Sequence, residues 1–232
     1  MCRGIGWRSR RESSCCRAGV YREDCIFAGR PIIGIVGGIG AGKSYIAKIF
    51  VEQGGHVINS DEQVARAYGT DEVKETLRKW WGDDAFKSDG SVDKRAVARR
   101  VFSEQGERRK LEGLLHPLVA KMRQEEMNSH AGDPAVTAWV WDTPLLLETG
   151  LDKECDAVVF VEADEMERQK RVREGRGWSA EELARREKSQ MPLDKKRQQA
   201  KYMIRNTAGA ADVRSQVREV FSRIVSGAPE MK

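Results

Sequence analysis

Short apolar runs, each followed by a segment with helical spacing, recur along the chain from residue 31 onward. Five segments predict strands: 31–37, 56–59, 135–142, 155–162 and 202–206. The longer ones are continuously apolar rather than alternating, which is typical of strands buried on both faces of a parallel sheet. Strands that alternate with helices predict an α/β fold in which helices flank a parallel sheet.

Helical spacing fills the intervals between these strands. The first helix follows the first strand and is stopped by the glycine pair Gly54–Gly55. Four more helices are predicted between the second and third strands, over 62–81, 93–102, 105–113 and 118–129. After the fourth strand, Asp164 with Glu167 and Ser179 with Glu182 have the spacing of capping boxes. The pattern then breaks at Pro192 and closes with a helix over 211–225.

This order of elements predicts three parts. Residues 31–61 and 135–232 form a core with a basic segment at about 168–200, and residues 62–134 form a helical insertion. Residues 1–30 form an arm that holds seven arginines, three acids and four of the five cysteines, without apolar periodicity. A disordered arm, or translation from an upstream start, is favoured over an arginine-rich targeting arm or a metal-binding tail. Metal binding is disfavoured because the arm has no C-x-x-C pair and no histidine.

The composition is typical of a soluble globular protein. Charged residues make up 33% of the 232 residues and hydrophobic ones 40%, and no apolar run reaches the ~20 residues of a membrane helix. The net charge is +5, of which +4 lies in the arm, so the folded body gives no argument for a nucleic-acid partner. Cys155, the single cysteine after residue 30, is consistent with a reducing compartment and a cytoplasmic location.

The stretch "GIVGGIGAGKS" fits the phosphate-loop pattern G-x-x-x-x-G-K-S, with Gly37, Gly42, Lys43 and Ser44 at its fixed positions. Backbone N–H groups of such a loop cradle phosphates, its lysine reaches the β- and γ-phosphates, and its serine hydroxyl binds Mg²⁺. The predicted contacts with a nucleotide, ATP, are Gly38, Ile39, Gly40, Ala41, Gly42, Lys43, Ser44 and Tyr45. Tyr45 is unusual there, because a small hydroxyl residue is common at that position.

A protein that binds a nucleotide in this way could be a GTPase switch, a motor ATPase or a kinase. A GTPase needs the patterns N-K-x-D and D-x-x-G, and the chain contains neither. A motor ATPase commonly ends a strand in paired acids, whereas the strand over 135–142 ends in the single Asp142. Asp142 is a candidate to hold Mg²⁺ with Ser44, because metals lie at strand ends beside such loops. Its alternative role is that of a turn or cap residue.

A kinase is favoured by the basic segment after the fourth strand. Between Glu167 and Arg197 the chain has eleven lysines or arginines and six acids, with Arg168 and Arg171 on one helical face. A cationic lid of this kind stabilises the transferring phosphoryl group and excludes water. The alternative is a solvated helical face. Asp61, at the end of the second strand, is the candidate base for an acceptor hydroxyl, or else a helix cap.

Five blocks together resemble the dephospho-CoA kinase family over roughly residues 31–225: "GIVGGIGAGKS", "VINSDEQVAR", "LLHPLV", "WDTPLLLETG" and "SQMPLDKKRQQAKYMIRN". The resemblance implies ATP-dependent phosphorylation of the ribose 3′-hydroxyl of dephospho-CoA, giving CoA and ADP. It implies a P-loop kinase fold in which the helical insertion binds the CoA acceptor and the basic segment is a lid. It does not indicate an oligomeric state.

The resemblance also implies roles for individual residues. Asp61 and Arg171 match the family's catalytic aspartate and lid arginine, acting with Lys43. The other matches are Asn206 near the adenine and, for the acceptor, His116, Pro117, Pro144, Leu145 and Glu148. His116 has an equal alternative as a structural hydrogen-bonding residue.

Some positions depart from the family. Asn59 stands where the family usually has the first acid of Asp-x-Asp, and Lys201 and Arg205 replace residues that are commonly aspartate.

Two functions rival the dephospho-CoA kinase interpretation. One is a nucleoside or nucleotide kinase of the same architecture, and the other is a nucleotide-binding regulatory protein that has lost turnover. The histidine–proline block and "PLLLE" argue against the first, and intact Lys43, Ser44 and Asp61 argue against the second.

Overall fold

The computed structural model describes residues 26–207 and 209–227. The predicted arm lies outside the described residues up to residue 25, but its last five residues are folded. Strand β1 (Ile26–Phe27) pairs antiparallel with β2 (Arg30–Gly37). Phe27 is 1% exposed, and its carbonyl oxygen accepts a hydrogen bond of 3.1 Å from Trp139 Nε1. The predicted boundary at residue 30 is therefore wrong, because a buried aromatic anchors the chain three residues earlier.

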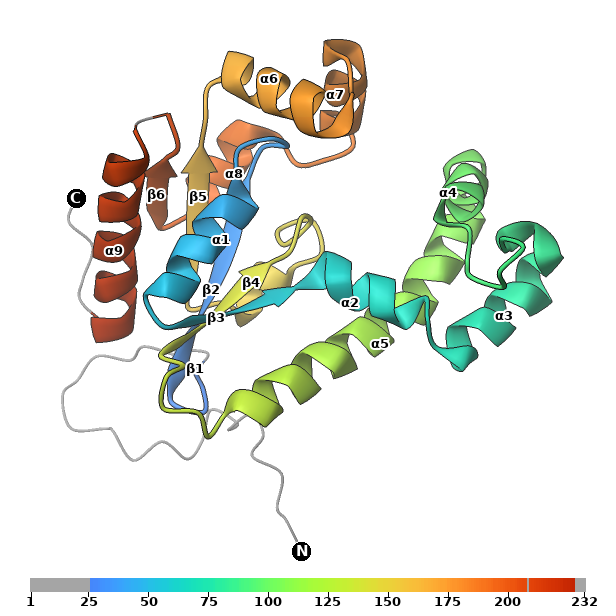
Figure 1. The fold of residues 1–232 in the computed structure, drawn as a ribbon, viewed down its shortest axis with the longest axis horizontal. Coiled ribbons are helices and arrows are strands. Elements are labelled where there is room, and N and C mark those ends of the chain that lie inside the picture. The colour runs from blue at the N-terminus through green and yellow to red at the C-terminus, as the bar shows by residue number, and fades with distance from the viewer. Residues whose placement is uncertain (1–25, 208, 228–232) are drawn as a thin grey trace, which may run out of the picture. The chain divides into compact units, whose positions relative to one another are not determined.

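The central sheet has the strand order β3-β4-β2-β5-β6, with β1 attached to β2 (Figure 1). The strands after β2 are β3 (Gly55–Asn59), β4 (Ala138–Asp142), β5 (Ala157–Glu162) and β6 (Tyr202–Arg205). β2 pairs in parallel with both β4 and β5, and β5 pairs in parallel with β6. All five predicted strands are present and the α/β class is confirmed. β4 and β5 begin three and two residues later than predicted.

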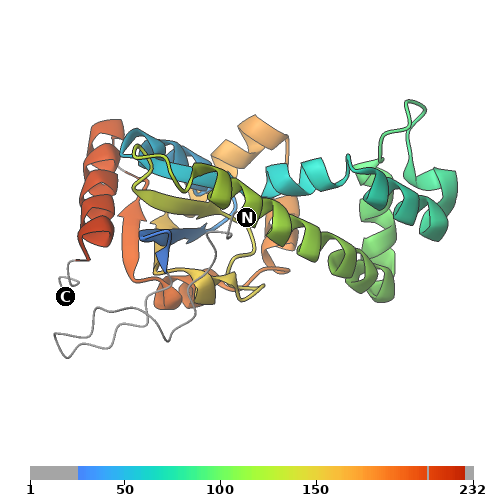
Figure 2. The ribbon, with the colours of Figure 1, turned by 90° about the horizontal axis from the view of Figure 1, so that it is seen from below.

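Helices cover both faces of this sheet (Figure 2). Helices α1 (Lys43–Glu52) and α9 (Ala210–Ser226) pack on one face, against side chains such as Ile33, Ile35 and Val159. Helix α8 (Leu193–Gln199) contacts β2 and β5 on the other face. With both faces covered, β2 and β4 are buried almost throughout, which explains their continuous apolar runs.

The C-terminal ends of the strands lead into the segments that carry the predicted chemistry. β2 runs into the phosphate loop, β4 ends at Asp142 before a turn that continues to the short helix η2 (Leu151–Glu154), and β5 leads into α6 (Glu165–Arg176). Ser179 caps α7 (Ala180–Glu187) as predicted, with Glu182 N–H donating to its hydroxyl at 3.2 Å. Asp164 precedes α6 without a side-chain cap bond, so that predicted capping box is wrong.

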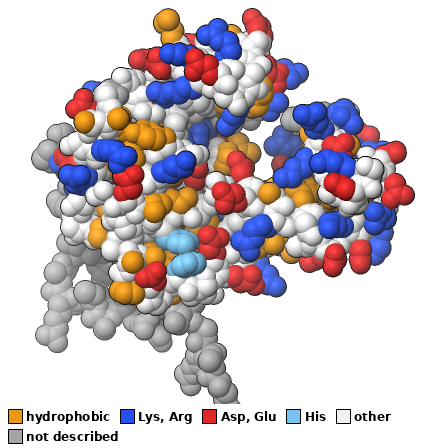
Figure 3. All heavy atoms as spheres, viewed as in Figure 1, with side chains coloured by type: hydrophobic (Ala, Val, Ile, Leu, Met, Phe, Trp, Pro, Cys, Tyr) orange, Lys and Arg blue, Asp and Glu red, His pale blue; other side chains and the backbone are white. Residues whose placement is uncertain are grey.

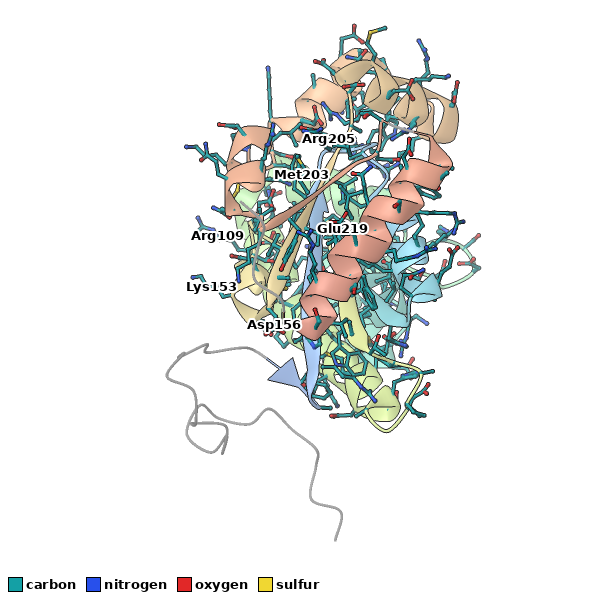
Figure 4. The ribbon with its side chains drawn as sticks, turned by 90° about the vertical axis from the view of Figure 1, so that its left-hand side faces the viewer. Arg109, Lys153, Asp156, Met203, Arg205 and Glu219 are labelled. Carbon is teal, nitrogen blue, oxygen red and sulfur yellow. The ribbon has the colours of Figure 1, made fainter. Side chains whose placement is uncertain are left out.

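The edge strand β6 is tied to α9 by a side-chain amide. Gln216 accepts a hydrogen bond from Arg205 N–H at 2.9 Å, and its Nε2 donates to the Arg205 carbonyl at 3.3 Å. In Figure 4, Met203 and Arg205 lie on β6 and Glu219 lies on α9. The amide thus satisfies backbone groups that an edge strand would otherwise leave to another chain.

Residues 59–127 form a second compact unit with its own apolar core. Its helices are α2 (Ser60–Ala67), α3 (Asp71–Trp81), η1 (Gly82–Ala85), α4 (Lys94–Ser103) and most of α5 (Gln105–His130). The single helix predicted over 62–81 is divided between α2 and α3. Thr70 divides it, because its hydroxyl donates to Ala67 O at 2.7 Å and accepts from Val73 N–H at 3.4 Å.

Helix α5 is continuous through Pro117, although the sequence predicted a break there. Leu111, Leu115 and Val119 are 7–8% exposed and lie one turn apart along the same stripe, in the core of this unit. Burying that stripe on both sides of the proline stabilises the helix by more than the ~3 kcal/mol that an interior proline costs. The division of the chain into functional domains stays a prediction.

Candidate active site

The phosphate loop occupies residues 38–42, between β2 and α1. The Lys43 ammonium donates to the carbonyls of Gly37 at 3.1 Å and Gly38 at 3.0 Å, so it lies over the start of the loop. Gly40 and Gly42 have φ angles of 78° and 92°, in the left-handed region that turns successive backbone N–H groups to one side. This geometry is that of an anion cradle at the N-terminus of α1.

We expect Gly40→Ala to weaken nucleotide binding and destabilise the protein. A Cβ at Gly40 would lie 2.7 Å from the Arg168 carbonyl oxygen and 2.8 Å from Val172 Cγ2, in a left-handed backbone. The left-handed conformation alone costs about 1–2 kcal/mol for a residue with a side chain. Thermal unfolding and binding of an ATP analogue measure both effects. Gly113→Ala, in open space on α5, is the matched control and should be neutral or stabilising.

Ser44 and Asp142, the two predicted metal ligands, lie together. Ser44 Oγ donates to Asp142 Oδ2 at 2.9 Å, and Asp142 is 6% exposed although it carries a carboxylate. A hydroxyl and a carboxylate supply the oxygen ligands that Mg²⁺ prefers. Within residues 26–207 and 209–227 no group of three or more His, Cys, Asp or Glu side chains could hold a metal ion. Two protein oxygens suit a cation that phosphate and water oxygens complete.

Arg171 and Asn206 converge on one carbonyl of the phosphate loop. Asn206 Nδ2 donates to Ala41 O at 2.8 Å, and an Arg171 guanidinium nitrogen donates to the same oxygen at 3.3 Å. Arg171 also donates to the Asn206 carbonyl at 3.1 Å. In a trans peptide the C=O and the next N–H point in opposite directions. These two side chains therefore hold Ala41 C=O back and aim the Gly42 N–H to the other side of the loop.

The lid arginines fall into two groups. Arg168, which the sequence placed on one face with Arg171 but did not assign to the site, is 5% exposed and donates to Ile39 O at 3.3 Å. Arg185 and Arg186 are exposed and both form ion pairs with Glu182. The i, i+3 spacing of Arg168 and Arg171 was the signal that could have identified Arg168. Of these four arginines, Arg168 and Arg171 are the two that donate hydrogen bonds to carbonyls of the phosphate loop.

Glu148 forms an ion pair with a buried lysine that the sequence pattern did not single out. Lys196 of α8 is 2% exposed, and its ammonium is 2.9 Å from Glu148 Oε1. The same oxygen accepts the Met191 N–H at 2.8 Å. Burial acts to raise the pKa of Glu148, but these two donors outweigh it and hold the pKa below its ordinary value. The pair joins the "PLLLE" turn, with Pro144 and Leu145, to the end of the lid.

Lys196→Met should lower stability at pH 7 by about 2 kcal/mol, less than for a fully buried pair because the Glu148 side chain is 19% exposed. The pKa of Glu148 is depressed, so the pair stabilises the fold above its unfolded pKa of about 4.3 and loses this contribution as the pH falls through the lower, folded pKa. The difference between variant and wild type should therefore shrink below about pH 4. Urea unfolding at both pH values tests this, with the exposed Lys195→Met as control; equal losses at both would contradict it.

Asp61 lies in the first turn of α2, in the second unit. Asn59 caps this helix, since its Oδ1 accepts the N–H groups of Asp61 at 2.9 Å and Glu62 at 3.2 Å. The alternative role of Asp61 as the cap is therefore wrong, and the residue that replaces the family's usual acid performs it. His116 and Pro117 are both exposed on α5.

Charges of both signs are mixed on the protein surface shown in Figure 3. Exposed ion pairs such as Arg78–Asp83 at 3.0 Å and Arg108–Glu112 at 2.8 Å illustrate this mixing in the second unit. In the described part of the chain, no helix is both long and apolar enough to cross a membrane. The absence of a nucleic-acid partner stays a prediction.

The family model of dephospho-CoA kinase matches residues 31–212, which includes the phosphate loop, the Ser44–Asp142 pair and the predicted lid. The chain belongs to the dephospho-CoA kinase family. Dephospho-CoA kinase of Corynebacterium glutamicum is 33% identical over 197 residues, covering 84% of this chain and 97% of the relative. That of Thermus thermophilus is 34% identical over 197 residues, covering 85% of this chain and 93% of the relative.

Solved structures agree with this membership. A crystal structure of a Thermus thermophilus protein has a TM-score of 0.74 at 31% identity, covering 87% of this chain and 99% of that chain. Dephospho-CoA kinase from Campylobacter jejuni has a TM-score of 0.62 at 22% identity, covering 85% and 98%, and supports the fold. Membership in this family of phosphotransferases excludes the GTPase and motor alternatives and decides against the nucleoside-kinase rival.

Proposed function

We propose that this chain transfers the γ-phosphoryl group of ATP to the ribose 3′-hydroxyl of dephospho-CoA, giving CoA and ADP. The observation that carries the proposal is the family match over residues 31–212. It is supported by the contacts of the phosphate loop, where Lys43 donates to Gly37 O, Ser44 donates to Asp142 and Arg171 donates to Ala41 O. The reaction is the final step of coenzyme A synthesis.

On the nucleotide side, each residue has a role that follows from its position. Lys43 neutralises the β- and γ-phosphates, and backbone N–H groups of the loop, such as those of Gly40 and Gly42, bind phosphate oxygens. Ser44 and Asp142 are the oxygen ligands that would hold Mg²⁺, which when bound offsets the charge of the phosphates. Asn206 acts on the nucleotide through Ala41, and Arg171 places positive charge beside the transferring group.

On the acceptor side, the roles rest on the family. Asp61 orients the 3′-hydroxyl and accepts its proton as the new bond to phosphorus forms. His116 and Pro117 on α5, and Pro144 and Leu145 after β4, contact the acceptor. Glu148 serves the acceptor by fixing that turn, because its Oε1 is engaged by Lys196 and Met191. We further propose a cytoplasmic location, which Cys155 as the single cysteine beyond residue 30 supports.

A coupled assay of ADP release tests this function. The full chain is incubated with ATP, Mg²⁺ and, in separate reactions, dephospho-CoA, adenosine, AMP, CMP or pantothenate. Release should require dephospho-CoA and be abolished by EDTA. Comparable turnover with a nucleoside or mononucleotide, and none with dephospho-CoA, would contradict the proposal.

A further inference from the structure

Arg168 is a buried arginine whose two charged or polar partners come from different parts of the core. It lies on α6 and is 5% exposed; one guanidinium nitrogen, NH1, donates to the carbonyl of Ile39 in the phosphate loop at 3.3 Å. The same nitrogen forms an ion pair with Glu187 near the end of α7. The Arg168 side chain therefore connects the phosphate loop to α7.

The loop packs against this arginine without room to spare. A Cβ at Gly38 would lie 2.7 Å from the Arg168 guanidinium, so the loop backbone runs directly over it. Beside this contact, the Ile39 side chain packs with Val172 of α6 and Leu183 of α7 in a small apolar cluster. The residues at the tip of the loop are thus held by both helices of the lid.

Stability alone does not explain a charged group here. Among the residues that the structure describes, no atom accepts a hydrogen bond from the buried Arg168 Nε. A buried donor without a partner is destabilising, and a buried ion pair is often no more stable than apolar side chains of the same size. The arrangement is better explained by what it does to the loop.

We propose that Arg168 is a positioning residue that sets the phosphate loop in its nucleotide-binding shape and couples that shape to α7 through Glu187. The inference rests on the proposed function and deepens it. By holding Ile39 C=O back, Arg168 aims the Gly40 N–H to the opposite side of the loop, as Arg171 and Asn206 do for Gly42. Arg168 and Arg171 thereby orient two of the amides that meet the phosphates.

Equilibrium binding of a non-hydrolysable ATP analogue, without acceptor, tests this role directly. Arg168→Met should raise the Kd about tenfold or more, because a charged hydrogen bond to the loop is lost. Arg173→Gln, exposed on the same helix, is the matched control and should bind like wild type. Glu187→Gln keeps the contact between Arg168 and the loop, so its Kd should rise only about threefold.

The double variant Arg168→Met with Glu187→Gln separates positioning from simple stability. If Arg168 positions the loop, the double variant binds the analogue as weakly as Arg168→Met. Recovery of affinity in the double variant, or an Arg168→Met protein that melts earlier yet binds like wild type, would overturn the proposal. If Arg168→Met does not fold, Arg168→Lys replaces it: an ammonium cannot reproduce the guanidinium geometry, and unchanged affinity there would be equally contrary.

The outcome is separate from that of the proposed function. Nucleotide affinity is measured with no acceptor present, whereas the acceptor panel is run on the wild-type protein. A wild-type chain that ignores dephospho-CoA would reject the function, and the affinities of the Arg168 variants would still decide the inference.

Discussion

Lys43→Ala should lower kcat/KM for ATP by about 10³-fold. The ammonium supplies the one side-chain charge inside the loop pattern, and stabilisation of charge at the transferring group commonly contributes more to catalysis than any other effect. Removing the ammonium also frees the carbonyls of Gly37 and Gly38, so both kcat and ATP affinity should fall. Steady-state kinetics and analogue binding measure the two effects.

Lys48→Ala is the matched control for this prediction. Lys48 is exposed on the same helix, and its truncation should change kcat/KM by less than twofold. A Lys43→Ala enzyme with near-normal turnover would show that the loop does not hold the reacting phosphates.

Asp61→Asn should lower kcat by about 10²–10⁴-fold while ATP affinity stays nearly unchanged. The substitution preserves size but removes the proton acceptor. Asn59 and not Asp61 caps α2, so the substitution leaves the helix cap intact, and thermal unfolding separates a loss of rate from a loss of fold. Rates under saturating substrates, analogue binding and thermal unfolding give the three readouts.

The neighbouring Glu62→Gln serves as control and should keep wild-type turnover, since Glu62 is also exposed and lies in the same first turn of α2. Near-normal turnover of Asp61→Asn would reject Asp61 as the base. Asp142 would then be the next carboxylate to test.

The sheet and the phosphate loop could be predicted from the sequence because their signals are local. A strand covered on both faces is apolar along most of its length, as β2 and β4 are. The phosphate-loop pattern predicts a strand before it and a helix after it. The pairing of Ser44 with Asp142 could also be predicted, because the C-terminal ends of parallel strands lie at one edge of a sheet. There β2 leads into the phosphate loop before Ser44, and β4 ends at Asp142.

What the sequence could not predict depends on contacts between distant residues. The sequence placed Arg168 on a cationic lid face, or else on a solvated helical face, and did not single out Lys196. Both side chains are buried because Glu187 and Glu148 supply opposite charges. Nothing in the spacing pairs residues 148 and 196. Pro117 indicated a break, but the apolar stripe through Leu111 and Val119 keeps α5 continuous. In each case packing decides against the local preference.

The position of the transferred phosphate is the most direct test of the proposed reaction. The wild-type chain is incubated with ATP, Mg²⁺ and dephospho-CoA, and the purified product is examined by ³¹P NMR and mass spectrometry. We expect one added phosphomonoester on the ribose 3′-oxygen, in a product identical to CoA. A phosphate at any other position, or ADP and inorganic phosphate with unchanged dephospho-CoA, would contradict this mechanism.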